Sequence, residues 1–184
     1  MLQNWWNKMK SWFLKNWLKW RVSWSNTKNK GDIINIEVEE SLYKSSLLNS
    51  LKTISKEVYS KFTWTQDNFG DLFDCMRTPA RCYSDYKQGA LNDDCDGFHA
   101  CVMQICKAAD IDCVLLTYMV PDLNQCHTIL VAKYNNSYYK VDYKNVTKFN
   151  CLDALIARIK TLHPDLIDYN MVKFDTKYYV VKDF

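Results

Sequence analysis

Three residue types that can together perform acyl transfer occur along the chain in the order Cys95, His127 and Asp142. A cysteine thiolate is nucleophilic, histidine is the commonest general base, and a carboxylate can orient the imidazole and stabilise its protonated form. The chemistry open to such a set is attack of the Cys95 sulfur on a carbonyl. The acyl group of the resulting thioester then passes to water or to an amine.

The sequence places Cys95 in the first turn of an expected helix over residues 95–109. That helix has one apolar face, because hydrophobic residues recur at three- and four-residue spacing, namely Phe98, Val102, Ile105 and Cys106. The unpaired N–H groups and the dipole of a helix N-terminus favour a negative charge. Cys95 is therefore a candidate nucleophile at the head of a buried helix.

The residues around Cys95 are acidic. Asp94 can cap the helix by accepting a hydrogen bond from the N–H near Gly97. Asp93, Asp94 and Asp96 also oppose a further negative charge on the sulfur. We therefore expect a nearby cation, and His127 is the best candidate for it.

His127 opens a β-rich run over 127–134, and a second run over 137–142 ends at Asp142. Asn135-Asn136 separates the two runs, and asparagine tolerates the positive φ that a tight hairpin turn needs. A two-residue turn places His127 and Asp142 as diagonal neighbours on one face, within reach of each other. A three-residue turn would put them on opposite faces.

These residues resemble the transglutaminase-like cysteine peptidase superfamily over about residues 62–146. The shared features are a cysteine that starts a helix after an acidic residue, a histidine that opens a later strand, and an aspartate in a Val-Asp-aromatic context. The upstream Asp71-Leu72-Phe73 and Pro79 resemble the lead-in of bacterial members. Asp93 replaces a common glycine and Ile129 a common aromatic, which blurs the subfamily and hence the substrate.

The resemblance implies an α+β fold of the transglutaminase-like or papain-like type, with the nucleophile helix packed on an antiparallel sheet. It also implies a Cys-His-Asp triad that hydrolyses a peptide or a side-chain amide through a thioester on Cys95, without a cofactor. Cross-linking of a protein substrate by an amine acceptor is a further outcome of the same chemistry. Most small single-domain members look like hydrolases, which favours hydrolysis by analogy.

Acyl transfer also needs hydrogen-bond donors aimed at the developing oxyanion. The backbone N–H of Cys95 is one candidate, and Gln66 or Trp64 could supply the other. The alternative for Gln66 is an exposed turn residue, and for Trp64 a packing aromatic. His99 is a rival base one helical turn after Cys95, but we prefer a packing or hydrogen-bonding role for it.

Residues 1–24 form an expected cationic amphipathic helix that holds six of the seven tryptophans, Trp5, Trp6, Trp12, Trp17, Trp20 and Trp24. No acidic residue precedes Asp32, and the interleaved lysines argue against a cleaved signal peptide and a membrane span. The helix could lie in a membrane interface, dock on a partner protein, or pack on its own domain. We expect a linker at 25–31 and the catalytic domain at 32–184.

Other expected elements follow from periodicity and from glycine and proline breaks. They are a short strand over 33–38, helices over 41–61 and 152–162, a strand over 111–120, and one or two closing strands within 171–181.

Composition sets further bounds. A chain of 184 residues with 48% hydrophobic content suits one domain plus an extension, and a formal charge of +3 does not indicate a nucleic-acid partner. Eight cysteines without a secretory signal favour a reducing, cytoplasmic location, with peripheral membrane or virion association left open. No Cys-x-x-Cys pair occurs, so we expect no metal site. The competing class is a non-enzymatic attachment or assembly protein that uses the fold as a scaffold.

Overall fold

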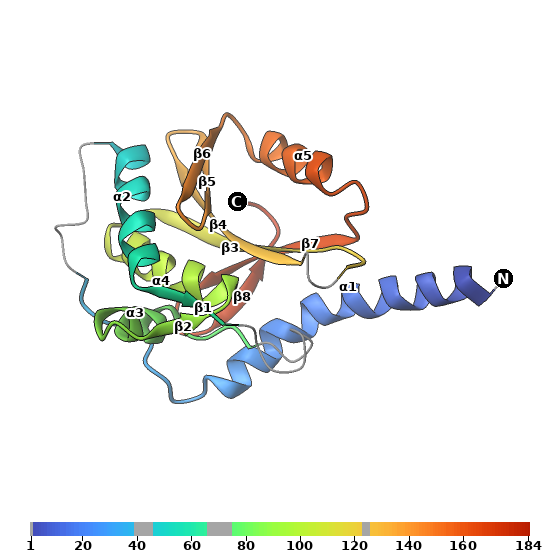
Figure 1. Ribbon diagram of the computed structural model, residues 1–184, viewed down its shortest axis with the longest axis horizontal. Helices are drawn as coiled ribbons and strands as arrows, with labels where there is room; N and C mark the ends of the chain where they lie inside the picture. The colour runs from blue at the N-terminus through green and yellow to red at the C-terminus, as the bar shows by residue number, and fades with distance from the viewer. Residues whose placement is uncertain (1, 39–45, 66–74, 123–125) are drawn as a thin grey trace.

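The computed structural model describes residues 2–38, 46–65, 75–122 and 126–184. The fold is α+β, built around a six-stranded antiparallel sheet in the order β6-β5-β4-β3-β7-β8 (Figure 1). Its strands are β3 (Asp112–Met119), β4 (His127–Tyr134), β5 (Ser137–Asp142), β6 (Asn145–Phe149), β7 (Asp168–Phe174) and β8 (Tyr178–Val181). A separate parallel pair joins β1 (Phe62–Trp64) to β2 (Leu91–Asp93), just before the helix that begins at Cys95.

The helices divide between the two faces of the sheet. They are α1 (Leu2–Lys28), α2 (Leu47–Ser60), α3 (Pro79–Lys87), α4 (Cys95–Ala108) and α5 (Leu152–Leu162). Successive strand residues point to opposite faces. Leu115 and Leu130 accordingly pack in the cluster that contains α2, α3 and α4, whereas Leu116 and Val131 pack in the cluster that contains α5. Helix α4, which begins at Cys95, packs on β3 and β4 of the antiparallel sheet, as expected.

The hairpin between β4 and β5 has the predicted two-residue turn. Tyr134 lies opposite Ser137, and Asn135 and Asn136 adopt φ values of 46° and 56°. Two successive residues at positive φ are typical of the type I′ turn, whose twist matches that of the flanking strands. The turn therefore sets the register that brings the start of β4 beside the end of β5.

Helix α1 corrects the predicted linker. It continues beyond Trp24 to Lys28, so most of the residues expected to separate two units are helical. Ser25 is buried and accepts a hydrogen bond from the Met76 backbone N–H at 3.0 Å, while Asn26 bonds both backbone groups of Tyr178. Side-chain partners in the folded body hold this end of the helix in place. The N-terminal half extends away from that body (Figure 1).

The other expected elements form with three differences. The helix expected over 41–61 is α2, which begins at Leu47 with Ser46 as its N-cap, and residues 41–45 lie outside the described part of the chain. Residues 33–38 are not a strand, although Ile36 and Val38 pack against the core and the Ile36 carbonyl accepts a hydrogen bond from Gln104. The closing strands are two, and β7 starts at Asp168, three residues before the expected range.

Candidate active site

The hairpin brings His127 and Asp142 into direct contact. The distance from His127 Nε2 to Asp142 Oδ1 is 2.9 Å, and Lys140 Nζ lies 3.0 Å from Asp142 Oδ2. Partial burial acts to raise the pKa of Asp142, but the hydrogen bonds and charges of His127 and Lys140 outweigh it and hold that pKa well below its usual range. Asp142 is therefore an ionised partner for the imidazole, and Nδ1 is the ring nitrogen left to accept a proton.

Aromatic rings surround the imidazole of His127. Its centroid lies 5.9 Å from that of Tyr118, 5.6 Å from that of Tyr143 and 5.9 Å from that of His99. The rings of Tyr118 and His99 stand edge-on to the imidazole. Together with the bond to Asp142, these contacts restrict the orientation of the ring.

Cys95 is the first residue of α4, as the sequence predicts. Its sulfur lies 3.3 Å from the backbone N–H of Thr128, the residue that follows His127. Cys95 and His127 both line a small cavity of about 40 Å³. Asp94 caps the helix, but it accepts from the N–H of Asp96, one residue earlier than expected.

The Cys95 thiol does not have the lowered pKa that a helix N-terminus alone suggests. Burial raises its pKa well above the usual value, and the charges of Asp94 and Asp96 act in the same direction. The Thr128 N–H and the positive charge of Arg21 oppose that change without reversing it. The raised pKa favours the neutral thiol form of Cys95.

The offsetting cation comes from Arg21 on α1, which sequence reasoning missed. Its side chain is buried, with Nη2 3.3 Å from Asp96 Oδ2 and Nη1 3.1 Å from the hydroxyl of Thr117. It also donates to the hydroxyl of Thr128 at 3.4 Å and lines the Cys95 cavity. The long N-terminal helix thus supplies a charged group to the site.

A helical-spacing signal for Arg21 was available. Leu14, Leu18, Val22 and Ser25 share one side of α1 with Arg21, and all five are buried. A charged residue within a buried stripe indicates a paired interior group, since unpaired charges are rarely buried. The tryptophan spacing, by contrast, indicates an apolar surface on the other side of the helix.

Three carboxylates cluster at the head of α4. Side-chain oxygens of Asp93, Asp94 and Asp96 lie within 4.8 Å of one another. Arg77 pairs with Asp93 at 2.9 Å, and Arg21 pairs with Asp96. Each carboxylate of this cluster thus has a partner, since Asp94 caps α4.

His99 is a positioning residue rather than a rival base. It is fully buried, with Nδ1 bonded to the Cys95 carbonyl and Nε2 accepting from the backbone N–H of Tyr143 at 3.2 Å. Burial lowers its pKa to about 3, and the neighbouring His127 acts in the same direction. A neutral His99 thus ties the start of α4 to the residue after Asp142.

The two oxyanion candidates have different outcomes. Gln66 lies outside the described residues. Trp64 ends β1 beside Asp93, but its side chain is 58% exposed and is not part of the Cys95 cavity lining. Trp17 does line that cavity, and the guanidinium of Arg21 lies 5.3 Å from its ring centroid. Trp17 therefore belongs to the site rather than to an external docking face.

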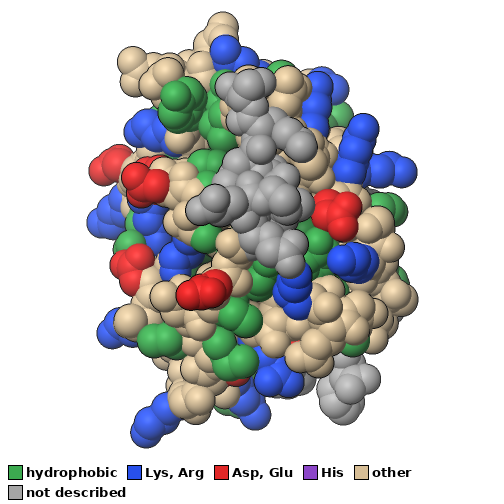
Figure 2. All heavy atoms as spheres, turned by 90° about the vertical axis from the view of Figure 1, so that its left-hand side faces the viewer, with side chains coloured by type: hydrophobic (Ala, Val, Ile, Leu, Met, Phe, Trp, Pro, Cys, Tyr) green, Lys and Arg blue, Asp and Glu red, His purple; other side chains and the backbone are tan. Residues whose placement is uncertain are grey.

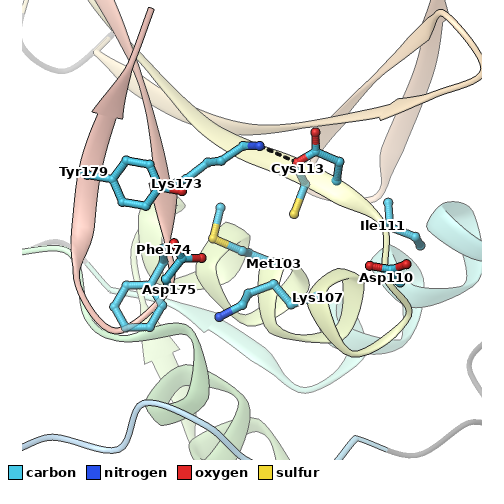
Figure 3. A pocket seen from close by; sticks show the side chains of 10 residues that line it. Met103, Lys107, Asp110, Ile111, Cys113, Lys173, Phe174, Asp175 and Tyr179 are labelled. Carbon is cyan, nitrogen blue, oxygen red and sulfur yellow. Dashed lines mark hydrogen bonds and ion pairs between the residues drawn. The ribbon is translucent and has the colours of Figure 1, made fainter. Parts of the chain in front are cut away.

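A larger cavity of about 450 Å³ opens at the other end of α4. Lys107, Cys113, Phe174 and Tyr179 are among its lining residues, and an ion pair of 2.6 Å joins Lys173 to Asp112 beside them (Figure 3). None of the residues that line this cavity is a histidine, so Cys113 has no imidazole base there. Cys95, by contrast, lines its cavity together with His127, which contacts Asp142.

No helix in the described part of the chain is both long enough and apolar enough to cross a membrane. Comparison of the chain with family models, with curated proteins and with solved structures yielded no match.

Proposed function

We propose that this protein is a cysteine-nucleophile acyl-transfer enzyme that hydrolyses a peptide or side-chain amide through a thioester on Cys95. The observation that carries the proposal is the 2.9 Å contact between His127 and Asp142, with the Cys95 sulfur held against the next residue, Thr128. The helix-on-antiparallel-sheet architecture supports the resemblance to transglutaminase-like cysteine peptidases.

The proposed reaction begins with a neutral thiol. As the Cys95 sulfur attacks the substrate carbonyl, His127 Nδ1 takes the thiol proton and Asp142 stabilises the imidazolium. The tetrahedral intermediate collapses, the carbon–nitrogen bond breaks, and His127 returns the proton to the leaving amine. Water then attacks the thioester with His127 again as base, which releases a carboxylic acid and restores the thiol.

The raised pKa of Cys95 favours the second candidate, a non-enzymatic attachment or assembly protein. A buried thiol flanked by two carboxylates is a poor nucleophile unless a base takes its proton during attack. The two functions therefore differ in whether the reactivity of Cys95 depends on His127.

Acylation by p-nitrophenyl acetate tests this dependence without knowledge of the natural substrate. Cys151 has the most exposed thiol among the eight, so all variants carry Cys151→Ser. We expect transfer of the acetyl group to Cys95 with release of p-nitrophenolate. Stopped-flow absorbance and peptide mass mapping follow the two products.

The matched variants are Cys95→Ala and His127→Ala. The first should abolish the acetylated peptide, and the second should slow its formation by about 10²–10⁴-fold, the usual contribution of a general base. If several cysteines are acetylated at rates that do not change in His127→Ala, the enzyme proposal is wrong. The result would then favour the non-enzymatic attachment or assembly protein.

A further inference from the structure

Helix α1 has two opposite faces. At 3.6 residues per turn, the side that packs on the domain lies opposite a second apolar side. The exposed residues of this second side define the aromatic face, Trp5, Met9, Trp12, Phe13, Trp20 and Trp24. Trp5 and Trp12 are each 61% exposed and Trp20 is 53% exposed. The side chain of Trp6 lies outside the described part of the chain.

Positive charge accompanies the aromatic face. The exposed Lys8, Lys15 and Lys19 lie along one edge of it by helical spacing, and no acidic residue precedes Asp32. Arg21, by contrast, points to the domain and pairs with Asp96. The outward side of the helix thus combines large aromatic rings with lysines that form no ion pair with another described residue.

We propose that the aromatic face binds the surface of an anionic lipid bilayer, with α1 lying in the plane of the interface. Tryptophan is favoured at the level of the headgroups, and lysines near the surface are attracted to anionic lipids. A second copy of α1 on the same face would bring like charges together. The negative partner that the lysines require is supplied by the bilayer.

The arrangement lets the helix bind lipid and keep its own domain at the same time. Leu14, Leu18 and Met119 form one buried cluster on the domain side, and Asn170 bonds the Leu18 carbonyl at 3.0 Å. The N-terminal half extends clear of the body (Figure 1). Figure 2 shows the end of the molecule away from the N-terminus, which differs from the aromatic face. Acidic and basic residues are interspersed at that end, and the visible hydrophobic side chains form only small areas.

Co-sedimentation of the full-length protein with vesicles tests the proposal. The two vesicle types are phosphatidylcholine alone and phosphatidylcholine mixed with phosphatidylserine. We expect binding to the mixed vesicles that weakens as salt is added, because headgroup attraction is screened. Trp5→Ala, Trp12→Ala and Trp20→Ala combined should reduce binding more than tenfold. Substitutions are used in place of a deletion of residues 1–24, because that deletion would also remove Arg21 and its ion pair with Asp96.

Matched variants assign the effect to this face. Trp64→Ala removes a tryptophan of similar exposure away from α1 and should leave binding within about twofold of wild type. Each of Lys8→Gln, Lys15→Gln and Lys19→Gln should weaken binding about fivefold at low salt. Cys95→Ala should bind normally, so loss of acyl transfer and loss of lipid binding are separable.

Three results would overturn the proposal. They are absence of binding to the mixed vesicles, equal binding by the triple tryptophan variant, and binding lost equally with Trp64→Ala. Light scattering supplies a further check. The wild-type protein could form a dimer and fail to bind vesicles, while the triple tryptophan variant is monomeric. That result would assign the aromatic face to self-association instead.

Discussion

The contact between Arg21 and Asp96 joins the N-terminal helix to the candidate nucleophile, and its removal has measurable consequences. The two side chains are 3% and 2% exposed, and their charged atoms lie 3.3 Å apart. Breaking a buried ion pair by deleting one partner typically costs about 3–5 kcal/mol, because the other charge stays buried without compensation. We expect Arg21→Met to lower the free energy of unfolding by this amount.

The same substitution should change the chemistry of the thiol. The positive charge of Arg21 acts to lower the pKa of Cys95, against burial and the charges of Asp94 and Asp96, which raise it. Its loss should raise that pKa further. Alkylation of Cys95 by iodoacetamide at a fixed pH should therefore be slower, since the thiolate is the reacting form.

Urea unfolding and alkylation kinetics measure the two effects. The matched control is Lys19→Met, which removes an exposed cation from the same helix and should change stability by no more than about 0.5 kcal/mol. The double variant Arg21→Met, Asp96→Asn removes both charges. It should recover roughly 2 kcal/mol relative to Arg21→Met alone.

The double variant also keeps the prediction open to refutation if Arg21→Met fails to fold. A folded Arg21→Met protein as stable as Lys19→Met, with unchanged alkylation of Cys95, would show that the ion pair neither anchors α1 nor influences the thiol. Absence of any recovery in the double variant would show that the charge on Asp96 is not what Arg21 compensates.

Two further predictions concern residues beside the site. His99 has a folded-state pKa of about 3, below its value of about 6.5 when unfolded. The unfolded chain therefore binds an extra proton between these values, and stability should fall as pH decreases through this window by up to roughly 1.4 kcal/mol per pH unit. The difference between wild type and His99→Asn in urea unfolding isolates this slope, and parallel curves would contradict it. Gly97→Ala would place a Cβ 2.1 Å from Asp93 Cγ, a carboxylate held by Arg77. We expect a loss of about 1–3 kcal/mol in unfolding free energy, and a loss below about 0.5 kcal/mol would mean that Asp93 can move aside.

Local patterns in the sequence were sufficient to predict the hairpin and the helix that begins at Cys95. Asn135-Asn136 specifies a two-residue turn because both residues accept positive φ, and side-chain alternation then puts His127 and Asp142 on the same face. The head of α4 is likewise a local feature, since the Asp94 cap and the apolar spacing act within a few turns.

Tertiary structure decided the electrostatics of the site, because burial and distant charges act through space. The dipole of α4 predicts a lowered thiol pKa, whereas enclosure and two nearby carboxylates raise it. The compensating cation is Arg21, which lies 74 residues before Cys95 on a helix that the sequence indicated to be a separate extension. The spacing of the tryptophans indicated one apolar side of that helix, and the second side, with Leu14, Leu18 and Val22, became evident only where the domain covers it.

The local sequence was thus enough to predict the secondary structure and the register around Cys95, His127 and Asp142, since both depend on neighbouring residues along the chain. Only the folded chain decided that Arg21 is interior and that most of the tryptophans remain exposed. The reason is that α1 packs Leu14, Leu18 and Val22 on the domain and pairs Arg21 with Asp96 there, which leaves the aromatic face, on the opposite side of the helix, turned outward.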